Sequence, residues 1–100
     1  MPARLPSRQT RIGPFETTLF RYPGKGGWHF AIVPERLAPA ATRPWGRTPV
    51  VATVDDETWT TSVWLDRKSN RSLLAVPKAR RAGKGHGDAV TVTLVVNDED

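Results

Sequence analysis

Short runs of apolar and polar residues alternate along the chain and are separated by residues that favour turns. Each run is rich in β-branched or aromatic residues, and glycine, proline or acidic residues bound it, as is typical of β-strands. The runs that predict strands are residues 15–22, 28–33, 48–54, 58–65, 73–76 and 88–96. The pattern therefore predicts a mostly-β protein.

Two further segments predict single short helical turns. Residues 34–38 and 77–82 both begin with proline, which suits the first turn of a helix. Pro39 ends the first segment and Gly83 ends the second.

An internal repeat relates the two halves of the sequence. Residues 31–36 (AIVPER) resemble residues 74–79 (LAVPKA), and each copy reads as strand, proline, helical turn, irregular link and strand. The repeat predicts two β-β-α-β units around a pseudo-two-fold axis, closed into a small six-stranded barrel without sticky edges. We expect Trp28, Phe30 and Val92 to face its interior, because a small domain needs its large apolar groups inside.

The length of 100 residues corresponds to one domain. We expect residues 1–14 to form a flexible basic arm, residues 15–96 the barrel and residues 97–100 an acidic tail. No apolar segment of secretory length follows the first residues, and no run approaches the roughly 20 residues of a membrane span. Together with the absence of cysteine, this predicts a cytoplasmic protein outside the membrane.

The charge is unevenly distributed. The net charge is +5 with a pI near 10.5, and residues 67–87 contain seven lysines and arginines without an acidic residue. This segregation is compatible with nucleic acid or another polyanion as a partner, but it does not identify one. The alternative, a basic surface with no such partner, stays open.

Two clusters are candidate binding sites for anions. In residues 43–47 an indole lies between two guanidinium groups, a combination suited to base stacking or anion binding. Trp45 could instead fold back as a lid on one barrel end. The second cluster lies in and after the second helical turn. The candidate binding residues are Arg43, Trp45, Arg47, Lys78, Arg80, Arg81 and Lys84.

The sequence offers no recognisable catalytic set. There is no cysteine, only two histidines occur, and the glycine-rich segments 23–27 and 83–87 do not match a phosphate-binding loop. We therefore predict a non-catalytic binding or interaction module, monomeric or homodimeric, without metal or cofactor. The alternative is a small-ligand barrel or minor enzyme with a pocket near His29, Arg47 and Thr61.

Several short motifs occur in a characteristic order and spacing. They are Phe15 with Leu19, Gly27-Trp28-x-Phe30 with Pro34, Gly46-Arg47-x-Pro49-Val50, Trp59-x-Thr61-Ser62, Leu73-Leu74 with Lys78, and Gly87-Asp88-x-Val90-x-Val92-x-Leu94. Over residues 15–96 this order resembles the small bacterial domain-of-unknown-function family numbered nineteen-oh-five.

The resemblance implies a six-stranded Greek-key barrel of the double-split type, distantly related to swapped-hairpin transition-state regulators and antitoxins. It implies no activity, because none is established for the family. This chain departs from the family between Pro77 and His86, where the segment is shorter and contains two extra glycines. Whether Lys78, Arg80 or Arg81 corresponds to the family's basic helix residues therefore stays open.

Overall fold

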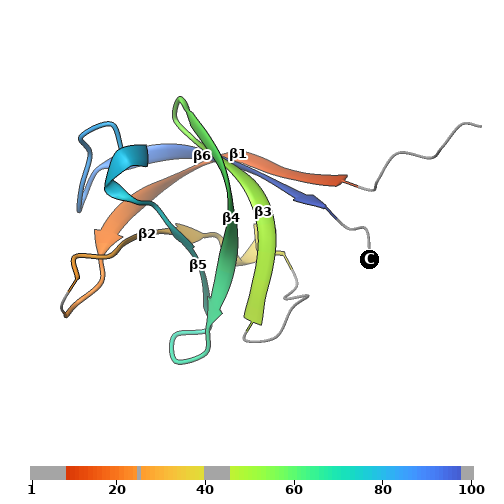
Figure 1. Ribbon diagram of the computed structural model, residues 1–100. Helices are drawn as coiled ribbons and strands as arrows, with labels where there is room; N and C mark the ends of the chain where they lie inside the picture. The colour runs from red at the N-terminus through yellow and green to blue at the C-terminus, as the bar shows by residue number, and fades with distance from the viewer. Residues whose placement is uncertain (1–8, 25, 40–45, 98–100) are drawn as a thin grey trace, which may run out of the picture.

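The computed structural model describes residues 9–24, 26–39 and 46–97, and they form a mostly-β protein as predicted (Figure 1). The strands are β1 (Gln9–Arg21), β2 (His29–Val33), β3 (Arg47–Val54), β4 (Glu57–Asp66), β5 (Arg71–Ala75) and β6 (Ala89–Asn97). Two short 3-10 turns, η1 (Glu35–Leu37) and η3 (Lys78–Arg80), lie where the sequence predicts helical turns. In this part of the chain no helix is long and apolar enough to cross a lipid bilayer.

The strands close into a barrel in the order β1-β2-β5-β4-β3-β6, and all neighbouring pairs are antiparallel. In the predicted repeat, β1, β2 and β3 correspond to β4, β5 and β6. When each strand is replaced by its counterpart, every pair of neighbouring strands becomes another pair of neighbours in the same ring. The closed six-stranded barrel with two related halves is therefore confirmed.

The first strand begins at Gln9 rather than at Phe15, so residues 9–14 belong to the barrel and not to an arm. β6 is long enough to pair with this extension, and Gln9 lies opposite Asn97. The register shifts between Ile12 and Phe15, where Gly13 adopts φ +100°. A Cβ atom on Gly13 would lie 2.6 Å from the carbonyl oxygen of Val92. The Gly-Pro pair therefore forms a bulge within a strand, whereas the sequence pattern read it as the end of an arm.

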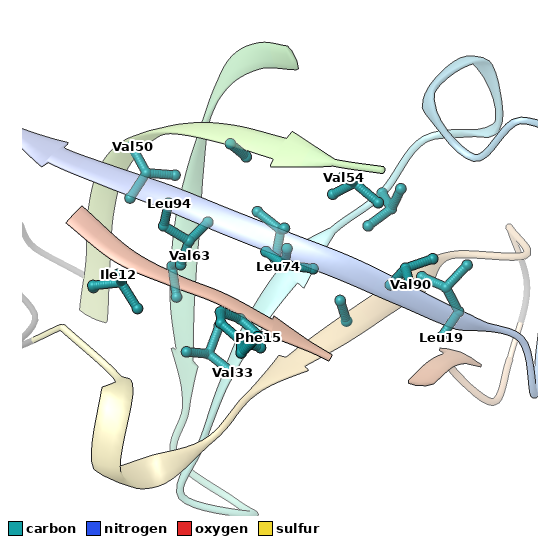
Figure 2. Close-up of a cluster of buried hydrophobic side chains, with 14 of the residues drawn as sticks. Ile12, Phe15, Leu19, Val33, Val50, Val54, Val63, Leu74, Val90 and Leu94 are labelled. Atoms are coloured by element: carbon teal, nitrogen blue, oxygen red, sulfur yellow. The ribbon is translucent and has the colours of Figure 1, made fainter. Parts of the chain in front are cut away.

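Side chains from all six strands fill the barrel (Figure 2). The largest fully buried side chains are Leu19, Leu74, Leu94, Val33, Val54, Val76, Val90 and Val92. Valine and leucine dominate because six strands enclose a narrow space in which branched aliphatic side chains pack well. Val92 faces the interior, as predicted.

Trp28 and Phe30 do not face the interior, and this prediction is wrong. Trp28 is 62% exposed and Phe30 is half-buried on the outside of the barrel. Ala31 and Val33, on the other face of the same strand, are the buried residues. Both faces of β2 are apolar, and the narrow interior takes the face with the smaller side chains.

Candidate functional site

The structure places the predicted binding residues in three different situations. Arg43 and Trp45 lie outside the described residues. Arg80 and Lys84 are paired with acids of the turn between β3 and β4. Arg80 Nη1 donates to Glu57 Oε1 at 3.1 Å, and Lys84 Nζ donates to Asp55 Oδ2 at 2.8 Å. These two cations therefore fasten the 78–88 segment to the β3–β4 turn, and the carboxylates compensate their charges.

The remaining predicted cations lie at two separate places. Arg81 donates from Nε to the Lys84 carbonyl oxygen and from Nη1 to the Val76 carbonyl oxygen, at 3.1 and 2.9 Å. Lys78 is exposed beside it. Arg47 lies on β3 directly opposite Trp64 of β4.

The Lys84–Asp55 contact favours the ionised form of the Asp55 carboxyl group. The hydrogen bond from Lys84 lowers the pKa of Asp55 below its ordinary value, and a bond from the Thr91 N–H at 3.0 Å lowers it further. A lowered pKa in the folded state means that the ionised carboxylate stabilises the fold. This stabilisation is present above the ordinary carboxyl pKa of about 4 and is lost as the pH falls through the lowered pKa.

Asp55→Asn is expected to destabilise the protein by about 1 kcal/mol at pH 7, because it removes a partly exposed, charge-assisted hydrogen bond. Asparagine tolerates the positive φ of 53° at this position, so the substitution tests the charge rather than the backbone. Urea unfolding at pH 7 and near pH 3 measures the effect, which should shrink at the lower pH. Asp56→Asn, at an exposed neighbour, is the control, and an equal loss in that variant would contradict the assignment.

An aromatic cluster covers the outside of β1 and β2. Phe20 lies opposite Phe30 across the two strands, with ring centroids 5.9 Å apart. Tyr22 meets Phe30 edge to face at 5.7 Å, and Trp28 stacks nearly parallel to Phe30 at 6.5 Å. These contacts hold the rings in fixed orientations, although Tyr22 and Trp28 remain 42% and 62% exposed.

The cluster forms one wall of an open apolar groove of about 490 Å³. Trp64, 41% exposed on β4, provides the other wall. The residues lining the groove are Tyr22, Trp28, Phe30, Trp64, Asp66, Leu73 and Ala75. Monomeric proteins seldom expose a contiguous aromatic patch unless it binds a partner.

Two further hollows adjoin the groove and share its tryptophan walls. On one side, Trp28 also lines a hollow that contains His29, Lys78 and Arg81. On the other side, Trp64 also lines a hollow that contains Arg47, and its remaining residues are Pro49, Thr60, Thr61 and Ser62. We call these three adjacent hollows the aromatic track. It runs across the outer surface from the start of β2, over β5, to β4 and Arg47 of β3. β2 and β4 are two strand spacings apart, which corresponds to about 10 Å.

The aromatic track has an apolar centre and cationic ends. Lys78 and Arg81 line one end and Arg47 lines the other, whereas Asp66 is the single carboxylate among the residues that line the three hollows. The exposed residues Arg67, Lys68 and Arg71 flank Asp66 in the sequence or in the strand register. Lysine and arginine residues therefore outnumber carboxylates among the residues that line the track.

The alternative pocket that the sequence predicts, near His29, Arg47 and Thr61, is not a single cavity in the structure. His29 lies in the hollow beside Trp28, whereas Arg47 and Thr61 lie in the hollow beside Trp64. The two hollows share no lining residue.

Sequence reasoning missed the tryptophans that define the track, Trp28 and Trp64. A signal was present, because residues 28–33 and 73–76 are apolar on both faces. A strand of a closed barrel buries only one face in the interior. Doubly apolar strands therefore indicate a second apolar surface on the outside.

The fold and the track define a small closed antiparallel barrel with an open aromatic groove on its outer surface. Over residues 15–94 the chain matches the model of a family described as a domain of unknown function (DUF1905). The chain belongs to this family, which confirms the resemblance seen in the sequence. No curated protein and no solved structure matches the chain significantly.

Proposed function

We propose that the protein is a non-catalytic binding module for single-stranded nucleic acid. The observation that carries the proposal is the aromatic track, in which Trp28 and Trp64 separate an apolar centre from two cationic ends. Proteins that bind single strands combine exposed aromatic rings, on which bases stack, with positive charge that follows the backbone.

The geometry favours an unpaired strand over a duplex. The rings lie on the walls of a groove on the barrel surface, where a base must leave its neighbours to stack on them. Bases held within a duplex are already stacked and cannot enter. Stacking accepts any base because every base has a flat π surface, so we expect weak sequence preference.

A second copy of this chain is a less suitable occupant of the groove. A two-fold symmetric dimer places the same patch of each copy against the other. It would bring Lys78, Arg81 and Arg47 at the track ends, which form no ion pair with a described carboxylate, close to their counterparts. The net charge of +5 opposes this arrangement and attracts a polyanion.

The test is a titration of the full chain into a labelled single strand of about 12 nucleotides with mixed sequence. Fluorescence anisotropy should show binding in about 50 mM salt, weakening steeply in about 200 mM salt as counterion release predicts. Tryptophan fluorescence should be quenched in the same titration, because the stacked bases contact the indole rings.

A duplex of the same sequence should bind at least several-fold more weakly. Absence of binding to the single strand at low salt would remove the proposal. Sedimentation of the free protein tests the competing occupant, and a stable dimer whose formation protects Trp28 would favour self-association.

The proposal also places the protein in the cytoplasm, a compartment that suits a chain without cysteine.

A further inference from the structure

The hollow beside Trp28 gathers side chains that can carry positive charge. It encloses about 300 Å³, and none of its lining residues is acidic. The lining residues are Gly26, Gly27, Trp28, His29, Val76, Pro77, Lys78 and Arg81. They come from two segments far apart in sequence, the turn before β2 and the segment after β5, which lie at the same end of the barrel (Figure 1).

The His29 imidazole has a defined orientation in this hollow. Its Nδ1 atom lies 2.7 Å from the Gly27 carbonyl oxygen, and because a carbonyl can only accept, Nδ1 is the donor. The Nε2 atom is the nitrogen left for another partner. It lies near Gly85, which has no side chain, and a Cβ atom added there would be 3.9 Å from Nε2.

Lys78 and Arg81 have no carboxylate partner in the described part of the chain. Arg81 is fixed through Nε and Nη1 by carbonyl oxygens, which leaves both hydrogens of Nη2 unused. The Lys78 side chain makes no hydrogen bond or ion pair with the described residues. Their situation differs from that of Arg80 and Lys84, whose charges are paired with carboxylates.

We propose that this hollow is a phosphate subsite, in which Lys78, Arg81 and the protonated ring of His29 bind a phosphate group. Guanidinium, ammonium and imidazolium N–H groups are the donors that phosphate oxygens accept most readily, and protonation of His29 makes Nε2 such a donor. The inference rests on the proposed function in one respect: Trp28 forms the wall shared with the aromatic groove, so the phosphate would belong to the nucleotide whose base stacks on that ring.

The first test uses inorganic phosphate alone and follows the NMR signals of the protein at constant ionic strength, with chloride as the balancing anion. Saturable shifts are expected at the His29 ring, the Arg81 Nε–H and the Gly27 amide. Lys78→Ala should weaken the phosphate affinity about tenfold, the effect of losing one charge-assisted hydrogen bond. Lys78 is exposed and its side chain has no partner among the described residues, so this variant should remain folded.

Arg36→Ala is the matched control. It removes the same charge from an exposed residue in η1, which follows the opposite end of β2. It should change the phosphate affinity by less than about twofold. Absence of the three shifts, or equal weakening by both variants, would show only diffuse attraction and would overturn the subsite.

The second test uses a trinucleotide with and without a 5′-phosphate, which distinguishes a terminal phosphate from one inside the backbone. Shifts at His29 with both ligands support a backbone phosphate, and shifts only with the phosphorylated ligand support a terminal one. If both quench tryptophan fluorescence but neither shifts His29, the subsite is wrong and the proposed function stands. If inorganic phosphate binds but no oligonucleotide does, the proposed function fails and the subsite remains.

Discussion

Replacing both Trp28 and Trp64 with alanine is expected to lower the affinity for single-stranded DNA by at least about 30-fold. The loss of a stacking partner costs about 1–3 kcal/mol per base, and these two rings are the walls of the aromatic groove. Each single variant should show an intermediate loss. Anisotropy titrations at one fixed salt concentration measure all three variants.

The fold should survive these substitutions. Trp28 and Trp64 are 62% and 41% exposed and lie outside the buried core, so their removal leaves the packing of the barrel interior intact. Val51→Ala is the control, because Val51 is an apolar residue with 41% exposure on β3, outside the three hollows of the track. A folded double tryptophan variant that binds as tightly as Val51→Ala would refute the role of the track.

Leu74→Ala is expected to have the largest effect on stability, a loss of about 3 kcal/mol in the free energy of unfolding. Leu74 is fully buried in the centre of the barrel, where it lies opposite Ala31 of β2 and Val63 of β4 (Figure 2). Alanine would leave a cavity that the surrounding β-sheet cannot close. The net stability of domains is only about 5–15 kcal/mol, so this loss is a large share of the total.

Urea unfolding followed by circular dichroism measures the effect of Leu74→Ala. Val51→Ala again provides a comparison, because an exposed valine on the outer surface should cost less than about 1 kcal/mol. Equal losses in the two variants would mean that the interior is not packed as described.

The barrel could be predicted from the sequence because local signals and the repeat agreed. Proline and glycine bounded nearly every strand, and the similarity of residues 31–36 to residues 74–79 indicated how two halves would close. The start of β1 was not predictable from local signals. Gly13 and Pro14 favour a break, and only pairing with the distant β6 holds residues 9–12 in the sheet.

The candidate site was less predictable because it depends on which face of each strand lies inside. Alternation shows that Phe30 shares a face with Trp28 and not with Ala31. It does not show which face is interior when both are apolar. The size of the interior decides this, and it depends on the number of strands in the closed ring.

The basic cluster shows a second limit of sequence reasoning. Its charge is visible in residues 78–84, but the acids that compensate Arg80 and Lys84 lie more than 20 positions earlier in the sequence. In the sequence, those acids only mark the boundary between two predicted strands. Only the tertiary fold separates the two compensated cations from Lys78 and Arg81.

The strand order has a consequence for synthesis of the chain. β6 is the last strand to leave the ribosome, yet it fills the position between β1 and β3 in the ring. Until it emerges, β1 and β3 each lack one neighbour, and the nascent chain exposes the apolar residues that β6 later covers. We therefore expect the barrel to close only after β6 has emerged, in a single late step that joins the first and last strands of the barrel.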